Sequence, residues 1–282
     1  MNKWILGARI KTLPAAIAPV IVGTSLADQI KVINALLALI VSLSLQIAVN
    51  YANDFSDGVR GTDTNRVGPT RLVASKLATA SSVKNASFIS FFVAIIAGTL
   101  LAFNTSVWLI AVGLISILAA WGYTGGKKPY GYLGFGELAV FIFFGIVATV
   151  GSYYVQVEQI SSSALLLSIP MGSLSCAILV INNLRDLNQD KLVSKRTLAV
   201  KLGDANTRIF YLLLLVLAQV SAAAAASINN YALLTLLWLP LTYSAANQVL
   251  KGASGKELIT ILGKTSRLQF LLALTLAISL SI

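Results

Sequence analysis

The sequence consists largely of long apolar runs separated by short polar connections. Runs of about twenty apolar residues recur along nearly the whole chain, and each is long enough to cross a hydrocarbon layer of about 30 Å as a helix. Apolar and polar residues do not alternate within the runs, as they would in the strands of a membrane barrel. The pattern predicts an all-α, polytopic membrane protein. Its nine predicted transmembrane helices lie at residues 13–27, 34–53, 85–103, 106–123, 134–156, 164–184, 209–227, 231–248 and 261–281.

The composition supports this prediction, because 57% of the 282 residues are hydrophobic and only 11% are charged. Soluble domains carry about 25% charged residues. The apolar N-terminal segment also fits a cleavable signal peptide, but Pro14 and Pro19 interrupt it, so we predict a first helix that is retained. The chain has no histidine, which excludes histidine acid–base catalysis and histidine metal ligands. Its only cysteine, Cys176, excludes an intrachain disulfide and is predicted to be a small buried apolar residue.

The basic residues fall on one side of the predicted bundle. With nine spans, all of the 21 lysines and arginines except Lys31 lie on the same side as the N-terminus. The positive-inside rule makes this side cytoplasmic and places the C-terminus outside, for a multi-pass protein of the cell membrane. The two long connections, 54–84 and 185–208, lie on the cytoplasmic side. Because nearly all of the basic residues lie on one side of the spans, the net charge of +11 does not indicate that the protein binds nucleic acid.

Carboxylates and amides gather at the cytoplasmic ends of two apolar spans. In both clusters, Asn and Asp recur at every fourth position, which places them on one face of a helix. Oxygen ligands without histidine or cysteine suit a hard cation such as Mg²⁺. The first cluster contains Asn53, Asp54, Asp57 and Asp63, and the second contains Asn182, Asp186 and Asp190.

Two other interpretations of these acids remain open. They are solvated loop residues, or they form surface ion pairs with Arg60, Arg66 and Arg185 that contribute about 0–1 kcal/mol each. Basic residues in the same connections favour a different partner, since arginine and lysine complement a diphosphate. A metal, an anion and an adjoining apolar region together match an amphiphile with a diphosphate head and a hydrocarbon tail. The basic residues concerned are Arg71, Lys127, Lys128, Lys195 and Arg196.

A weak internal repeat accompanies the two clusters. The pattern Asn-x-x-x-Asp occurs at 53–57 and again at 182–186, and "TRLVASKL" (70–77) is echoed by "KRTLAVKL" (195–202). Chance similarity between short strings is one explanation. The other is a single domain over 1–282 built from two related halves, about 1–130 and 131–282, each of which supplies one wall of a shared site.

Several stretches resemble a known family. "NDFSDGVRGTD" (53–63) and "NNLRDLNQD" (182–190) are similar to the paired aspartate-rich motifs of the UbiA superfamily of intramembrane prenyltransferases. The resemblance extends in order from residue 8 to about 210 and is closest to the 1,4-dihydroxy-2-naphthoate polyprenyltransferases of menaquinone synthesis. The stretches that resemble this branch are "ARIKTLPAAIAPVIVG" (8–23), "VGPTRLV" (67–73), "YTGGKKPYGYLGFGE" (123–137) and "NNLRDLNQDKLVSKRTLAVKLG" (182–203).

The resemblance implies a nine-helix bundle around a central cavity that opens to lipid. It implies Mg²⁺-dependent transfer of a polyprenyl chain from a polyprenyl diphosphate to 1,4-dihydroxy-2-naphthoate, with loss of carbon dioxide, to give demethylmenaquinol. No nucleic acid and no obligate protein partner are expected, and membrane lipid surrounds the chain. Two Mg²⁺ ions are expected on Asn53, Asp57, Asp63, Asn182, Asp186 and Asp190. The residues expected to be catalytic are Asp57, Asp186, Asp190 and Arg71.

Substrate contacts follow from the same resemblance. Arg9 and Lys11 are candidates to hold the acceptor carboxylate, or else anchor the first span at the cytoplasmic surface. Tyr123 faces an allylic cation or belongs to the interfacial aromatic belt. The chain departs from the family pattern at Gly61, where many members have the third acid, and at Ile10, where the branch often has proline. The further substrate-binding candidates are Asp54, Arg71, Lys127, Lys128, Lys195 and Arg196.

Three other functions compete with this one. A cation-coupled transporter would place its acids near the bilayer midplane, whereas these lie at helix ends on one side. An intramembrane phosphotransferase would carry a denser Asp-Gly-x-x-Ala-Arg motif, which "DGVRGTD" does not reproduce. A prenyltransferase for 4-hydroxybenzoate or a tetrapyrrole stays open, because few stretches distinguish the acceptor.

Overall fold

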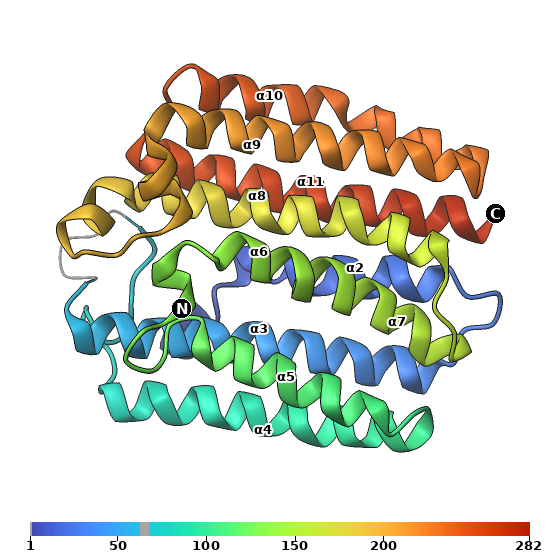
Figure 1. Ribbon diagram of the computed structural model, residues 1–282, viewed down its shortest axis with the longest axis horizontal. Coiled ribbons are helices and arrows are strands. Elements are labelled where there is room, and N and C mark those ends of the chain that lie inside the picture. Colours follow the sequence, from blue (N-terminus) through green and yellow to red (C-terminus); the bar gives the residue numbers. More distant parts are fainter. Residues whose placement is uncertain (1, 63–67) are drawn as a thin grey trace.

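The computed structural model describes residues 2–62 and 68–282, and its helices lie side by side along one common direction (Figure 1). No β-strand occurs in these two stretches. The elements are α1 (Lys3–Ala8), η1 (Ile10–Thr12), α2 (Pro14–Ser25), α3 (Val32–Arg60), α4 (Ala80–Asn104), α5 (Trp108–Gly122), η2 (Tyr130–Leu133), α6 (Gly136–Val140), η3 (Phe141–Val147), α7 (Ala148–Val157), α8 (Ser162–Leu192), α9 (Leu198–Ala224), η4 (Ala225–Ser227), η5 (Asn230–Trp238), α10 (Leu239–Leu250) and α11 (Gly255–Ser281).

Most predicted spans correspond to helices of the structure. By length and composition, six helical segments within the described residues can cross a membrane, and a seventh is obtained if the bent pair Lys3–Thr12 and Pro14–Ser25 is one span. The apolar helix α5 is shorter than the others. The protein is therefore an all-helical integral membrane protein, as predicted, and the count of nine spans stays a prediction.

The bend of 52° in the first segment has a local cause. Arg9 ends α1 in the left-handed conformation, with φ of 54°. Pro14 then begins α2 at a position where its missing N–H is not needed, because the first amides of a helix have no intrahelical partner. The bend places α1 in contact with α3, and the Thr12 hydroxyl of η1 accepts from Gln46 of α3.

The two long polar connections begin later than predicted. Helix α3 continues to Arg60 and α8 continues to Leu192, so both Asn–Asp motifs are helical throughout. Gly61 ends α3 in the left-handed region, with φ of 72°, which glycine adopts without steric cost. Residues four positions apart therefore lie on the same helix face throughout both motifs.

Helix α8 forms the centre of the bundle. In its most apolar window, 78% of the residues are buried, and it contacts α2, α7, α9, α11 and η3. Gly145 of η3 and Gly172 of α8 allow these two segments to approach closely, since a Cβ on Gly145 would lie 2.7 Å from the Cα of Gly172. Large apolar side chains on the outer helices are exposed, such as Trp108 at 78% exposure. Such surfaces are suited to contact with lipid.

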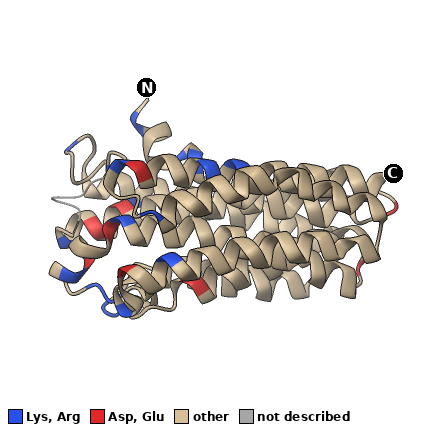
Figure 2. Ribbon diagram, turned by 90° about the horizontal axis from the view of Figure 1, so that it is seen from above, with Lys and Arg blue, Asp and Glu red and all other residues tan. Residues whose placement is uncertain are grey.

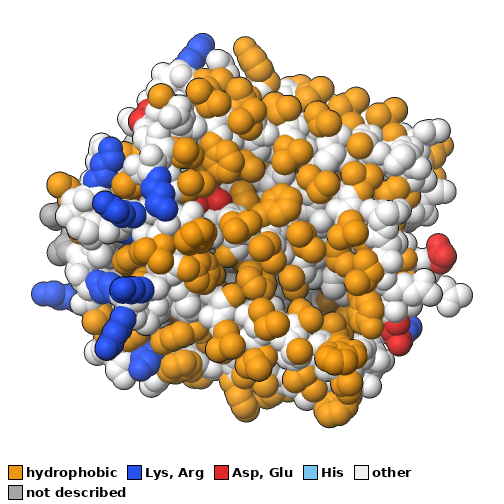
Figure 3. All heavy atoms as spheres, viewed as in Figure 1, with side chains coloured by type: hydrophobic (Ala, Val, Ile, Leu, Met, Phe, Trp, Pro, Cys, Tyr) orange, Lys and Arg blue, Asp and Glu red, His pale blue; other side chains and the backbone are white. Residues whose placement is uncertain are grey.

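Lysine and arginine gather at one end of the bundle, which we call the basic end (Figure 2 and Figure 3). The N-terminus lies toward this end and the C-terminus at the opposite end (Figure 1). Lys31, at the start of α3, pairs instead with Glu158 at the end of α7, with Nζ 3.4 Å from Oε1. The structure thus reproduces the one-sided distribution of basic residues that the sequence predicts.

Candidate active site

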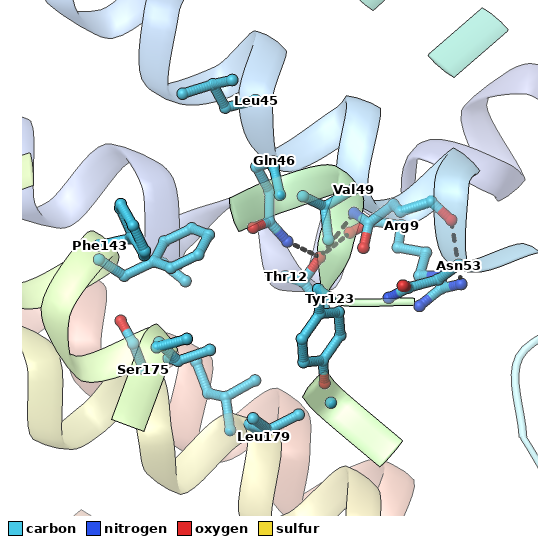
Figure 4. Close-up of a pocket in the computed structure, with 18 of the residues that line it drawn as sticks. Arg9, Thr12, Leu45, Gln46, Val49, Asn53, Tyr123, Phe143, Ser175 and Leu179 are labelled. Carbon is cyan, nitrogen blue, oxygen red and sulfur yellow. Dashed lines mark hydrogen bonds between the residues drawn. The ribbon is translucent and has the colours of Figure 1, made fainter. Parts of the chain in front are cut away.

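A cavity of about 770 Å³ begins at the basic end and continues between the helices. Its walls are polar where α3 and α8 end and mainly apolar farther along. Figure 4 shows part of this cavity, with Gln46 and Val49 of α3 on one side and Phe143, Ser175 and Leu179 on the other. The residues of both motifs that line it are Asn53, Asp57, Asn182, Asp186 and Asp190.

The two motifs, more than a hundred residues apart in sequence, meet at one lysine. Lys195 Nζ lies 3.5 Å from Asp57 Oδ2 and 4.0 Å from Asp190 Oδ1. The backbone N–H of Lys195 also donates to the carbonyl of Asp190, at 2.9 Å, just beyond the end of α8. One ammonium group therefore joins the ends of α3 and α8.

The carboxylates are buried rather than solvated. Asp57 is 2% exposed, Asp186 is 7% exposed and Asp190 is 6% exposed. Arg71 approaches Asp57 as a second cation, with Nη2 3.8 Å from Oδ2. Buried carboxylates need such partners, because an unpaired charge away from water is costly. The interpretation as solvated loop residues is therefore wrong for Asp57, Asp186 and Asp190, while Asp63 lies outside the described residues.

Arg185 and Asp186 form a buried ion pair. The guanidinium donates from Nε and Nη2 to the two carboxylate oxygens, both at 2.8 Å, and Nη2 also donates to Asn182 Oδ1 at 2.8 Å. The side chain of Arg185 is only 1% exposed. The alternative of a pair with Arg185 is thus correct in its partners, but the pair lies inside the protein and not on its surface.

Tyr132 is a site residue that the sequence reasoning missed. Its hydroxyl donates to Asp57 Oδ1, and Lys195 Nζ and Arg60 Cζ lie over its ring, 4.7 and 5.1 Å from the centroid. Burial, followed by the charge of Asp57, raises the pKa of Tyr132, so the phenol stays protonated and donates. The stretch "YTGGKKPYGYLGFGE", which carries part of the family resemblance, contains Tyr132 and was the available signal.

Replacing Tyr132 by Phe is expected to lower the activity of the site without changing the fold. The change removes one hydrogen bond to a carboxylate, worth about 1.5–3 kcal/mol, and hence about 10- to 100-fold in kcat/KM. Steady-state kinetics on purified protein would measure the loss. Tyr243→Phe is the matched control, because Tyr243 is 71% exposed. Equal activity of the Tyr132→Phe variant and the unchanged protein would contradict this role.

Several predicted site residues do not line the cavity. Asp54 accepts instead from the backbone N–H groups of Leu72 and Val73, at 2.8 and 3.0 Å, and so holds the segment after α3 in place. Asp63 lies outside the described residues. The roles predicted for these residues stay predictions. Of the candidates that the structure describes, Lys127, Lys128 and Arg196 also do not line the cavity and are exposed.

Arg9 and Lys11 do line the cavity, at its side formed by the bent first segment. Arg9 Nη2 donates to the carbonyl of Asn50 at 3.3 Å, and the Thr12 hydroxyl accepts from Gln46 at 3.1 Å. Figure 4 shows Arg9 and Thr12 beside Gln46 and Asn53. These contacts hold the first segment against α3, and they place a guanidinium within the polar part of the wall.

Tyr123 lies on the cavity wall at the end of α5 (Figure 4). On the neighbouring wall, Asn183 Nδ2 donates to Glu137 Oε1 at 2.9 Å. Glu137 is 5% exposed, and it fixes the orientation of the Asn183 amide by accepting from its nitrogen. Sequence reasoning did not identify Glu137 or Asn183, because neither belongs to an i, i+4 acid pattern.

The donor set fits a hard cation. Asn53 Oδ1 is buried and has no hydrogen-bond partner among the described residues. Amide and carboxylate oxygens from both motifs share the cavity wall, while no group of three or more His, Cys, Asp or Glu in the described parts of the chain could hold a metal by itself. Mg²⁺ is often bound by one or two carboxylates plus substrate phosphates. The residues therefore suit a cation that arrives with a phosphorylated substrate.

Comparison with known proteins adds to this picture. Residues 16–277 match the UbiA prenyltransferase family. A relative from Mycobacterium tuberculosis, named 1,4-dihydroxy-2-naphthoate octaprenyltransferase, is 49% identical over 278 residues, which cover 98% of this chain and 95% of the relative. A relative of the same name from Escherichia coli is 38% identical over 261 residues, which cover 88% of this chain and 85% of the relative.

Solved structures share the fold. A UbiA homolog from Aeropyrum pernix K1 has a TM-score of 0.74 at 13% identity, and the match covers 96% of this chain and 97% of the homolog. A UbiA homolog from Archaeoglobus fulgidus, solved with DMAPP and Mg²⁺, has a TM-score of 0.70 at 10% identity, with 98% and 99% covered. At these identities the likeness concerns the arrangement of the helices.

Proposed function

Because this chain belongs to the UbiA prenyltransferase family, we propose that it transfers a polyprenyl chain from a polyprenyl diphosphate to 1,4-dihydroxy-2-naphthoate. The product would be demethylmenaquinol, formed with loss of carbon dioxide. The observation that carries the proposal is the joining of both Asn–Asp motifs by Lys195 at the polar end of a long apolar cavity. This arrangement matches a substrate with a charged head and a hydrocarbon tail.

The polar end of the cavity is suited to the diphosphate. Arg71 and Lys195 both lie within 4 Å of Asp57 and line the cavity, so their charges are directed to the same place. Bound Mg²⁺ would neutralise charge that develops on the departing diphosphate. Asp57 and Asp190, already in contact with Lys195, are the carboxylates that we propose as its ligands, with Asn53 contributing an amide oxygen. We propose Asp186, which lines the same cavity, as a further ligand. Whether one or two ions bind is part of the test below.

The apolar part of the cavity is suited to the reactive carbon and the tail. When the carbon–oxygen bond to the diphosphate breaks, the allylic carbon becomes electron-poor and must be kept from water. Phe143 and Leu179 line the cavity beside Tyr123 and exclude water there (Figure 4). The ring of the acceptor then forms the new carbon–carbon bond. We propose that Arg9 and Lys11 hold the carboxylate of the acceptor.

The basic end would face the cytoplasm, with the C-terminus outside. The gathering of lysine and arginine at that end supports this orientation through the positive-inside rule. Both proposed substrates would then enter from the cytoplasmic side or from the adjoining lipid.

The proposed function predicts metal-dependent transfer with a definite acceptor preference. Purified protein in lipid vesicles would be incubated with a radiolabelled polyprenyl diphosphate and either 1,4-dihydroxy-2-naphthoate or 4-hydroxybenzoate. We expect label in the naphthoate product only, no transfer after chelation with EDTA, and recovery on adding Mg²⁺. Titration of Mg²⁺ against activity would show how many ions are needed, since two ions give a steeper dependence than one.

Two results would contradict the proposal. Transfer to 4-hydroxybenzoate alone would show that the proposed acceptor is wrong, although prenyl transfer itself would be retained. Full activity in EDTA would show that transfer does not need a metal ion. A variant with a neutral amide in place of an exposed acid, Asp204→Asn, serves as the control protein, because the Asp204 side chain is 58% exposed and pairs with Arg208 away from the cavity wall.

A further inference from the structure

Toward the end of the cavity that is remote from the basic end, three glycines on three helices line its wall. They are Gly98 of α4, Gly113 of α5 and Gly151 of α7. Gly98 lies six residues before the end of α4, Gly113 five residues after the start of α5, and Gly151 six residues before the end of α7. Because neighbouring helices α4 and α5 run in opposite directions, these positions lie at a similar depth in the bundle.

Gly113 and Gly151 border open space, and Gly98 has a single side-chain neighbour. A Cβ added to Gly113 or Gly151 would have no heavy atom within 4 Å, and one added to Gly98 would meet only Val41 Cγ2 at 3.7 Å. All three are helical, where glycine is less favourable than alanine by about 1 kcal/mol, so helix formation does not explain them. At these three positions, the cavity wall therefore has no side chain that would occupy the adjoining space.

Gly23 and Gly145, by contrast, serve close helix packing. A Cβ on Gly23 would lie 2.1 Å from a backbone oxygen of α7, and one on Gly145 would lie 2.7 Å from the backbone of α8. Small residues at such positions let transmembrane helices approach. The three cavity glycines have no such neighbour, so packing does not explain them either.

The glycines lie far from the polar end. Asp57 and Val41 both line the cavity on α3 and are sixteen residues apart in sequence, which corresponds to about 24 Å along a helix. Val41 is the neighbour of Gly98. If the diphosphate of a prenyl chain lies beside Asp57, only the part of the tail about 24 Å away reaches the glycines.

We propose that Gly98, Gly113 and Gly151 determine the longest prenyl chain that the enzyme transfers efficiently. The proposal rests on the proposed function and adds the feature that selects the donor. The space left by the missing side chains accepts the remote part of a long tail. Shorter donors end before this depth and make no contact with it.

The test is a series of increasing side chains at two of the positions. Gly113 and Gly151 would each be replaced by Ala, Val and Leu, and kcat/KM would be measured with octaprenyl diphosphate and with geranyl diphosphate. We expect activity with the octaprenyl donor to fall progressively, by about tenfold or more for Leu, because filling an apolar pocket discriminates on this scale. Activity with the geranyl donor should change by less than about twofold, which also shows that each variant folds.

The matched control is Gly263→Leu in α11. A Cβ on Gly263 likewise has nothing within 4 Å, but this glycine does not line the cavity. We expect the same ratio of octaprenyl to geranyl activity in this variant as in the unchanged protein. A ratio that stays constant through the Gly113 and Gly151 series, whether both activities fall or neither does, would overturn the proposal. Absence of transfer from either donor by the unchanged protein would instead overturn the proposed function.

Discussion

Replacement of Asp57 by Asn is expected to reduce prenyl transfer by about a thousandfold, the upper range for loss of one well-placed electrostatic group. Asn keeps the shape of the side chain but removes the charge that faces Lys195 at 3.5 Å and Arg71 at 3.8 Å. A neutral amide is a weaker ligand for a hard cation than a carboxylate. The measurement is kcat/KM with saturating acceptor, at several Mg²⁺ concentrations.

The control for Asp57 is an acid of the same type elsewhere in the chain. Asp204→Asn removes an ion pair whose acid is 58% exposed, which contributes about 0–1 kcal/mol, so transfer should persist. If excess Mg²⁺ partly restores the Asp57 variant but does not affect the control, Asp57 acts through the metal. Near-normal turnover of the Asp57→Asn variant would show that this carboxylate is not a ligand.

Replacement of Asp186 by Ala is expected to abolish transfer and also to lower stability. The buried Arg185 would lose both of its carboxylate contacts, and an unpaired buried charge costs about 3–5 kcal/mol. Loss of activity in this single variant is therefore compatible with either a catalytic or a structural role. Thermal unfolding in detergent would measure the structural part.

A double variant separates the two roles of Asp186. Arg185→Gln combined with Asp186→Asn removes both charges and keeps polar groups of similar size, so most of the stability should return. Transfer should remain absent if the carboxylate binds the metal. A double variant that is stable and fully active would show that Asp186 serves only as the partner of Arg185.

The helical spacing of the motifs made the central feature of the site predictable. Asn and Asp at every fourth position indicated one helix face, and the structure places Asn53, Asp57, Asn182, Asp186 and Asp190 around one cavity. The resemblance to the UbiA superfamily is confirmed by the family match over residues 16–277. The internal repeat and the two related halves stay predictions.

The interactions that cross between segments were not predictable in the same way. Asp54 directly follows Asn53 in α3 but accepts from the backbone of Leu72 and Val73, because successive helical positions point about 100° apart. Lys127 and Lys128 are close in sequence to Tyr132, yet only Tyr132 reaches Asp57. Proximity in sequence did not separate basic residues on the surface from those in the cavity.

Local periodicity and composition were enough to establish a helical membrane protein, the side on which its basic residues lie, and the two Asn–Asp faces, because each depends on neighbours within a few turns of one helix. Packing between distant helices decided the rest. It joined α3 and α8 through Lys195, and it buried the pair of Arg185 with Asp186. It also left Gly113 and Gly151 beside open space, while Gly23 and Gly145 were placed in close backbone contact. Those outcomes depend on which segments meet, and helices distant in sequence meet only in the folded bundle.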